Sequence, residues 1–478
     1  MNGLKRNAVF LPIFIGLSIA FPIVTPLAAY ELASTFINFQ CVNIQNCNIY
    51  RFKQKESTNM INRQSFAEKG LMQGDTVVWM IFIFLCLTSI IEVYSACSTM
   101  SYKSGQYWAP MIEHGAYVVM GFILTWVIHL IPFKHFKILS VLGLHFLAYP
   151  LLVMALFTAK INDAGRWVTI GGKTIQPSEF AKIALVGFVA FVLASFRNEK
   201  GVSEKAFKLV ALEIFVTLCL IVTENASTAG IIFLVMLGIL FYAQAPKKYM
   251  AWVCGAILAG IIAIAAALTL INDEALEKMD VSDNPILHRV PTWVNRVKGY
   301  EMPEDPQHYN IHDNLQVTHA KIAIATCGIT GKGPGNSVER DYLPQAYSDF
   351  IYAIIIEEGG IFLGVFVMSL YLLLMWRAMK IARNSKSLFA AYLVMGLALM
   401  MVVQAMINMA VAVGAFPVTG QPLPLISRGG TSTFVNCAYI GMILSVSHYA
   451  KKKKKTLPLT NLAEPTETKV SSVDKQES

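Results

Sequence analysis

The chain has 478 residues, of which 55% are hydrophobic and only 14% are charged, and its mean hydropathy is +0.53. A soluble domain of this length needs more polar surface to cover its core, so the composition excludes that class and indicates a polytopic membrane protein. Lysine and arginine outnumber aspartate and glutamate by 39 to 30, and the net charge of +9 fits cytoplasmic loops beside anionic lipid rather than nucleic-acid binding. We therefore expect membrane lipids, and no nucleic acid, among the partners.

Residues 1–74 form an N-terminal extension that precedes the regular pattern of spans. Its stretch 8–29 is apolar and follows two basic residues, as in a signal peptide or an additional span. Cleavage there would leave the basic segment 31–74 outside the membrane, against the charge rule for the next helix. A start codon assigned too early, with the protein beginning near Met60 or Met72, is a third interpretation.

Apolar segments of about 20 residues, long enough to cross a bilayer, predict an all-α protein with ten transmembrane helices in a domain covering 75–450. Lysine and arginine gather in alternate connections between these segments, which predicts that those connections and the C-terminus are cytoplasmic. The predicted spans are 75–97, 110–131, 137–158, 178–196, 207–223, 228–245, 248–272, 349–376, 388–413 and 431–450.

The connection at 273–348, between the seventh and eighth spans, faces the other side of the membrane and is unusually long. It mixes aromatic residues, glycine and proline with charge, so we expect a folded, functional extracytoplasmic loop. The tail at 451–478 is basic and then rich in Thr, Ser, Lys and Glu, which predicts a disordered cytoplasmic tail. Four carboxylates lie close together in the long loop: Glu301, Glu304, Asp305 and Asp313.

Charged residues in or near the spans are candidates for function, because a charge is costly at membrane depth. Glu179 and Lys182 are three residues apart on one helix face, close enough to neutralise each other. They would either hold the bundle together or form part of a substrate site. Glu357 and Glu358 are adjacent, so we expect only one of them to face the interior of the bundle. Four further residues belong to this set: Glu92, Glu113, His114 and Glu213.

Three outward segments carry denser motifs. Segment 163–182 joins Arg166 and two glycines to a proline-led helix start, which fits either an outward phosphate site or a plain interfacial hairpin. Segment 331–360 contains Gly-Lys-Gly, but it lacks the Ser or Thr that a nucleotide-binding loop needs after Lys332. Segment 416–433 has three prolines and three glycines, so its irregular backbone must be buried in protein or line a water-filled cavity.

The stretches "GRWVTIGGKTIQPSEFAK", "GPGNSVERDYLPQAYSDFIYAIIIEEGG" and "TGQPLPLISRGGTST" resemble the signature regions of the SEDS family, the bacterial proteins of shape, elongation, division and sporulation. The resemblance runs from about residue 75 to 450, with the motifs in the same order. It implies a SEDS fold and a peptidoglycan glycosyltransferase that polymerises lipid II at the outer face of the bacterial cytoplasmic membrane. The stretch "GNSVERDYLP" resembles the division members of the family more than the elongation members, which implies septal wall synthesis at the division septum.

The sequence departs from the family pattern at three places, so no role of the missing histidine, tyrosine or aspartate is carried over. His-Thr-Asp-Phe is here Tyr347-Ser348-Asp349-Phe350, and Ser-Tyr-Gly-Gly is Ser427-Arg428-Gly429-Gly430. Pro-Asp-x-Gly-Thr is Glu224-Asn225-Ala226-Ser227-Thr228.

The resemblance also implies a site in the outward loop. An essential aspartate aligns with Asp305 and a glutamine aligns with Gln316. Asp305 would take the proton from the attacking sugar hydroxyl, and one base suffices because pyrophosphate is a good leaving group. The other substrate or pyrophosphate candidates are Arg166, Lys173, Asp349, Glu357, Glu358, Ser427, Arg428, Gly429 and Gly430. A divalent cation, Mg²⁺ or Mn²⁺, is chemically reasonable beside the pyrophosphate, but the spacing of residues shows no metal site.

The implied partners are lipid II, a class B penicillin-binding protein with transpeptidase activity, and other divisome proteins. The alternatives are an elongation-type polymerase, a lipid II flippase and an inactive division scaffold. A transporter predicts inverted repeats and broken helices at the membrane midplane. The sequence has no convincing repeat, and its distinctive residues gather on one side of the membrane, which favours surface chemistry.

Overall fold

Helices make up most of the part of the chain that the structure, a computed structural model, describes. The described residues are 72–97, 109–157, 167–170, 173–198, 201–223, 225–251, 253, 255, 315–343 and 346–455. The predicted N-terminal extension, the span at 248–272, the loop residues 273–314 and the tail beyond 455 therefore lie wholly or largely outside the described residues. The described residues from Gly74 onward belong to one compact unit.

The described helices follow the predicted spans closely. Within the described ranges six helical segments are long and apolar enough to cross a membrane, and α9, α10 and α17 fill three further predicted spans. The helices are α3 (Thr76–Ala96), α5 (Ala109–Leu130), α6 (Phe136–Leu142), η2 (Gly143–Ala148), α7 (Tyr149–Phe157), α8 (Pro177–Ser195), α9 (Glu204–Val222), α10 (Ala226–Tyr242), α14 (Leu315–Thr326), α15 (Ile351–Asn384), α16 (Leu388–Ala412) and α17 (Gly430–Lys455), with short turns η1 (Phe133–His135) and η5 (Glu339–Asp341). The prediction of a mostly helical, polytopic membrane protein is confirmed.

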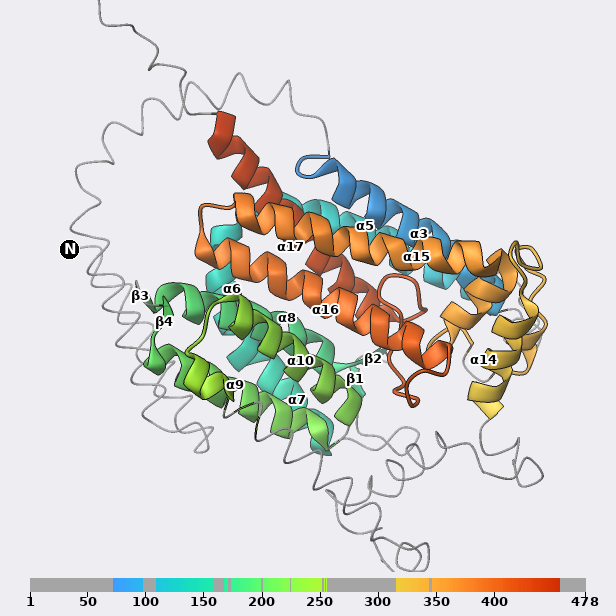
Figure 1. The fold of residues 1–478 in the computed structure, drawn as a ribbon, viewed down its shortest axis with the longest axis horizontal. Coiled ribbons are helices and arrows are strands. Elements are labelled where there is room, and N and C mark those ends of the chain that lie inside the picture. Colours follow the sequence, from blue (N-terminus) through green and yellow to red (C-terminus); the bar gives the residue numbers. More distant parts are fainter. Residues whose placement is uncertain are drawn as a thin grey trace, which may run out of the picture. The chain divides into compact units, whose positions relative to one another are not determined.

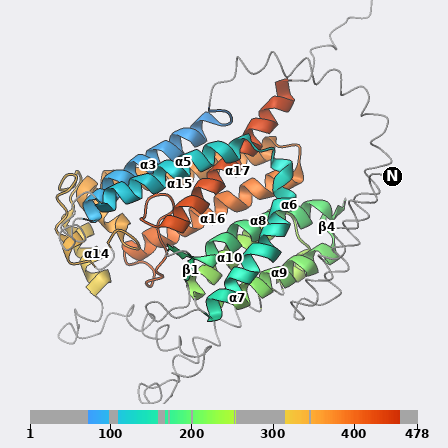
Figure 2. The same cartoon turned by 180° about the vertical axis from the view of Figure 1, so that it is seen from behind.

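Helix α16 lies at the centre of the bundle (Figure 1). It packs against α15 on one side and against α8 and α10 on the other. Helices α3 and α15 pack together, and α5 covers α17, as the view from behind shows (Figure 2). Most of the apolar residues of α16 are buried, because protein rather than lipid surrounds this helix.

The two ends of the bundle differ in character. The strands β3 and β4, the connection from α15 to α16 and the end of α17 lie at one end, where the basic residues gather (Figure 1). At the opposite end lie the hairpin β1–β2 (168–175), α14 with η5 (315–343) and segment 413–429. We call this second group the loop end.

The first span begins with a charged cap that also ties it to the eighth. Asp75 accepts hydrogen bonds from Val77 N at 3.0 Å and Val78 N at 3.3 Å, which satisfies free amides at the start of α3. Its carboxylate also forms an ion pair with Arg377 of α15. Since Asp75 is only 3% exposed, the pair fixes the relative height of the two helices.

Two short antiparallel hairpins add strands that the all-α prediction did not include. Strand β1 (Val168–Ile170) pairs with β2 (Lys173–Ile175), and β3 (Arg197–Asn198) pairs with β4 (Gly201–Val202). The first hairpin lies in segment 163–182, where a plain hairpin was one of the two interpretations of the sequence. It leads into α8, which starts at Pro177 as the sequence predicted.

Helix α15 is longer than the predicted span at 349–376, and it is broken. Gly360 has φ 71° and ψ −178°, which no helical residue adopts. The carbonyl groups freed by the break accept hydrogen bonds from a distant loop: Lys332 N donates to Glu357 O at 2.9 Å, and Gly333 N donates to Glu358 O at 2.8 Å. The loop thus replaces the missing helical hydrogen bonds, which the interior of a membrane protein requires.

Candidate functional site

An irregular segment at 413–429 occupies the loop end between α16 and α17. Gln404 Nε2 donates to the carbonyl of Pro422 at 3.0 Å, and Asn408 Nδ2 donates to the carbonyl of Gln421 at 2.7 Å. Gln404, Asn408 and Gln421 are each at most 3% exposed. Residues 419–427 are therefore largely buried in protein, the first of the two arrangements that the prolines and glycines predicted, whereas Val413 and Phe416 are exposed.

A buried ion pair lies beside this segment. Lys182 Nζ is 2.7 Å from Glu179 Oε1 and 3.0 Å from Gln404 Oε1, and both charged residues are 1% exposed. The predicted contact between Glu179 and Lys182 is confirmed. Within the described ranges Glu179 Oε2 and the Tyr439 hydroxyl have no hydrogen-bond partner. The pair therefore holds α8 against α16 and leaves one carboxylate oxygen for another polar group.

Replacing Lys182 by methionine is expected to lower the stability of the protein by about 3–5 kcal/mol, because the Glu179 carboxylate would stay buried without its cation. The midpoint of thermal unfolding in detergent measures this effect. The double variant Glu179→Gln/Lys182→Met should recover most of the loss, since a neutral amide costs less to bury. An unchanged midpoint in the single variant would show that water reaches the carboxylate.

The side chain of Arg428 joins four segments at the loop end. Its Nη2 is 2.7 Å from Glu113 Oε2, its Nη1 lies 3.7 Å from the sulfur of Cys97, and its guanidinium lies 5.7 Å from the ring centre of Tyr347. The backbone amide of Arg428 donates to the carbonyl of Tyr347 at 3.0 Å.

Ser427 and Asp349 are brought together by backbone contacts. Ser427 Oγ donates to Ser348 O at 2.6 Å and accepts from Leu423 N at 2.7 Å. Ser348 Oγ donates to Asp349 Oδ1 at 2.8 Å, and Asn408 Nδ2 donates to the Asp349 carbonyl at 2.8 Å. Two segments that the sequence singled out separately therefore form one structural unit.

Helix α17 starts at the loop end, directly after Gly429. Thr433 N donates to Gly429 O at 3.0 Å, and Thr431 Oγ1 is 3.5 Å from the carbonyl of Thr174 on β2. Lys173 precedes Thr174 on that strand, although its side chain is not among the described groups. The amides at a helix start attract anions, so Arg428, Gly429 and Gly430 stand where a phosphate group is favourable.

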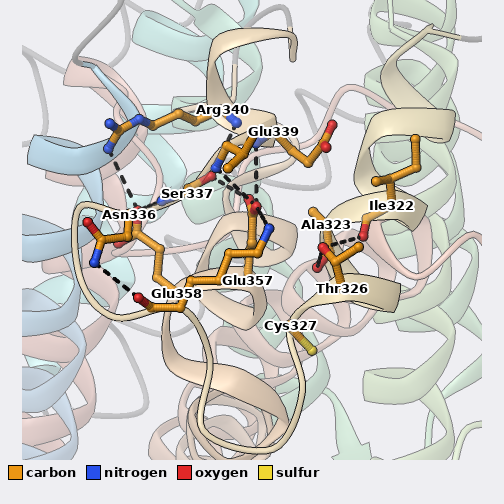
Figure 3. A network of polar contacts seen from close by, with 12 residues as sticks. Ile322, Ala323, Thr326, Cys327, Asn336, Ser337, Glu339, Arg340, Glu357 and Glu358 are labelled. Carbon is orange, nitrogen blue, oxygen red and sulfur yellow. Dashed lines mark hydrogen bonds and ion pairs between the residues drawn. The ribbon is translucent and has the colours of Figure 1, made fainter.

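Glu357 is completely buried and binds the glycine-rich loop (Figure 3). Lys332 Nζ lies 2.6 Å from Glu357 Oε1, and Val338 N donates to the same oxygen at 3.0 Å. Ser337 donates its hydroxyl to the other carboxylate oxygen. The lysine of the Gly-Lys-Gly sequence therefore neutralises a carboxylate of the protein.

Glu358 binds the same loop, so the expectation that only one of the two glutamates faces the interior was wrong. Glu358 is 1% exposed and accepts from Gly335 N at 2.9 Å and from Ser337 N at 3.3 Å. It also accepts from the Ser95 hydroxyl, and Arg340 Nη1 lies 3.9 Å away. Both carboxylates are enclosed because the loop folds back over the broken helix and covers both faces, an arrangement that helical geometry alone does not reveal.

A histidine of α14 pairs with a glutamate of η5. His319 Nδ1 is 2.6 Å from Glu339 Oε2, and the imidazole stacks on Tyr342 with ring centres 5.4 Å apart. The sequence prediction did not include this pair, because His319 and Glu339 lie on separate elements. Gln316, the predicted substrate residue, lies one turn earlier on the same helix α14.

Several predicted site residues lie outside the described residues. Asp305 and Arg166 are among them, as are the other three carboxylates of the long loop: Glu301, Glu304 and Asp313. Within the described part of the chain, no group of three or more His, Cys, Asp or Glu residues could hold a metal ion.

Some polar residues of the site were missed although the sequence contained a signal. Gln404 and Asn408 are four residues apart in an otherwise apolar span, so they lie on one helix face. A polar stripe in a transmembrane helix indicates a buried contact. Their partner at 421–422, by contrast, could not be read from local spacing.

Comparison with known proteins gives a consistent family. Residues 75–452 match the FtsW, RodA and SpoVE family, described as cell cycle protein. A protein of Coxiella burnetii named probable peptidoglycan glycosyltransferase FtsW is 29% identical over 391 residues, which cover 80% of this chain and 98% of that protein. The protein with the same name from Halomonas elongata is 30% identical over 77% of this chain and 89% of its own length.

Solved structures share the fold. A structure of a peptidoglycan synthase complex that coordinates polymerization and crosslinking matches with a TM-score of 0.57 and 20% identity, covering 78% of this chain and 97% of the other. The rod shape determining protein RodA of Thermus thermophilus matches with a TM-score of 0.53 and 20% identity, over 78% of this chain and 96% of its own.

Proposed function

The chain belongs to the FtsW, RodA and SpoVE family of cell cycle proteins, and we propose that it is a peptidoglycan glycosyltransferase that polymerises lipid II. The observation that carries the proposal is the match over residues 75–452 together with relatives named for this activity at 29% and 30% identity. The arrangement of the loop end supports it, since polar groups from five separate segments gather there.

The reaction joins two sugars that are each attached to a membrane lipid. A hydroxyl oxygen of the acceptor attacks the anomeric carbon of the donor, the bond from that carbon to undecaprenyl pyrophosphate breaks, and Asp305 accepts the hydroxyl proton. Pyrophosphate leaves with its electron pair and needs positive charge around it. This charge comes from three basic side chains and one helix start: Arg428, Lys173, Arg166 and the first amides of α17.

Neighbouring groups position this chemistry rather than take part in it. Ser427 fixes the segment that carries Arg428, and Gln404 and Asn408 hold the same segment against α16. Glu357 and Glu358 are occupied by the loop at 332–340, which favours a structural role over direct substrate contact. Glu179 and Lys182 remain candidates for contact with the substrate through the free carboxylate oxygen of Glu179.

We place the activity at the outer face of the bacterial cytoplasmic membrane, in septal wall synthesis. The basic connections at the other end of the bundle support this orientation, with a cytoplasmic C-terminus. Relatives named FtsW support division over elongation. A class B penicillin-binding protein is the expected partner, in line with the synthase complex that shares the fold, and other divisome proteins would join it.

A lipid II transporter is the second candidate, because α15 is broken and broken helices form transport sites. The break at Gly360, however, is filled by the loop amides of Lys332 and Gly333, which occupy the carbonyls of Glu357 and Glu358. This arrangement favours surface chemistry over transport.

The test supplies purified lipid II to the detergent-solubilised protein with its transpeptidase partner and measures glycan chain length. Long glycan is the expected result. The same protein in vesicles with lipid II in one leaflet provides the second measurement. Transfer of lipid II across the bilayer without any glycan would make the protein a transporter, and the absence of both would make it a scaffold.

A further inference from the structure

The guanidinium of Arg428 is held in a preformed cage. The Tyr347 ring lies beside it, the sulfur of Cys97 lies 3.7 Å from Nη1, and the Arg428 backbone is fixed to Tyr347 O. The Arg428 side chain is only 16% exposed. These contacts leave the charge in place whatever anion it meets, which is a requirement of a preorganised anion site.

Glu113, the carboxylate on this guanidinium, is held much less firmly. Its side chain is 53% exposed, and besides Arg428 it binds the hydroxyl of Tyr117, which donates to Glu113 Oε1 at 3.1 Å. Because the Glu113 side chain is about half exposed, its carboxylate keeps part of its hydration and leaves the guanidinium at lower cost than a buried partner would. The Arg428 guanidinium is therefore held firmly, whereas the Glu113 carboxylate bound to it is replaceable.

The surroundings of Arg428 and Glu113 indicate which kind of anion would replace the Glu113 carboxylate. Arg428 lies two residues before the start of α17, whose first amides favour a second anionic oxygen. The hydroxyl of Thr431 in the first turn points to the hairpin that carries Lys173. A ligand that satisfies both the guanidinium and the helix start carries at least two negative oxygens, as a pyrophosphate group does.

We propose that Glu113 occupies the oxyanion site of Arg428 in the resting protein, and that the pyrophosphate group of the lipid-linked donor displaces it during binding. The inference rests on the proposed function and adds a built-in competitor to its anion site. Because an internal carboxylate lowers the apparent affinity of every competing anion by the same factor, weakly bound single phosphates and carboxylates would leave the site empty at concentrations where a pyrophosphate still fills it.

The test variant is Glu113→Gln, which keeps the shape of the side chain and removes its charge. We expect the KM for lipid II to fall about 3- to 10-fold with little change in kcat, and inorganic pyrophosphate to inhibit at concentrations lower by a similar factor. Glu204→Gln is the matched control, because Glu204 also accepts from a tyrosine, Tyr249, at 3.1 Å. Glu204 begins α9 directly after β4, which lies at the opposite end of the bundle (Figure 1). The Glu204→Gln variant should behave as wild type.

A second measurement does not need catalysis. Inorganic pyrophosphate should raise the thermal midpoint of Glu113→Gln more than that of the wild type, and Glu113→Gln/Arg428→Gln should lose this gain. Equal shifts in all three proteins, or a higher KM together with a lower midpoint without ligand, would overturn the inference and make Glu113 a structural partner of Arg428. Wild-type protein that makes no glycan would instead refute the proposed function, and the thermal measurement still judges the anion site.

Discussion

Alanine in place of Asp305 is expected to abolish glycan polymerisation while the protein still folds and binds its transpeptidase. A positioned base contributes about 10²–10⁴-fold to the rate of a proton transfer, so its removal should lower the rate by at least about 100-fold. The other parts of the reaction cannot compensate, because positive charge on the pyrophosphate assists departure of the leaving group but takes no proton from the attacking hydroxyl. Glycan length from purified lipid II measures the loss.

The neighbouring carboxylates provide the control for this variant. Glu301→Gln and Asp313→Asn change the charge of the same loop by the same amount, yet they should keep most of the activity if they are solvated neighbours. Equal glycan from wild type and Asp305→Ala would show that the alignment of the loop is wrong. Loss in all three variants would instead indicate a shared role for the carboxylates, such as binding a cation.

Features with a local cause were predicted well from the sequence. The spans follow from hydrophobic length, the start of α8 follows from Pro177, and the contact of Glu179 with Lys182 follows from their spacing of three residues. The last two depend on residues within about one turn of helix, where helical geometry fixes the neighbours, and each span depends on one continuous run of about 20 residues. Tertiary packing did not alter any of these three features.

Features with a distant cause were not predictable. Arg428 meets Glu113 although 315 residues separate them, and Ser95 meets Glu358 across 263 residues. The adjacent pair of glutamates pointed to two faces as expected, but the sequence could not show that a loop covers both. Membrane helices also hide their packing, since their lipid-facing and buried positions are similarly apolar.

The broken helix leads to the second large effect. Valine in place of Gly360 is expected to prevent the protein from reaching its folded state, because the position tolerates no side chain. A φ of 71° with ψ near 180° is a conformation essentially restricted to glycine. A Cβ atom there would lie 2.1 Å from the carbonyl oxygen of Ile329 and 2.6 Å from the amide nitrogen of Gly331, well inside contact distance.

The backbone cannot move aside without a further loss. Shifting Gly331 would pull the neighbouring loop amides away from the backbone carbonyls of Glu357 and Glu358. The side-chain carboxylates of the same two residues would also lose their contacts with the loop. Strain at a special conformation combined with unpaired buried charge places the cost among the rare substitutions above about 4 kcal/mol. The yield of monodisperse protein in detergent and its thermal midpoint measure it.

Gly230→Ala is the matched control for the Gly360 variant. Gly230 lies within the regular helix α10, and a Cβ atom added there meets nothing within 4 Å, so alanine should leave yield and midpoint unchanged or slightly raise the midpoint. Normal yield and melting of Gly360→Val would mean that α15 runs unbroken and that the loop at 332–340 does not cap it. The transport interpretation would then lose its structural basis as well, because it depends on the same break.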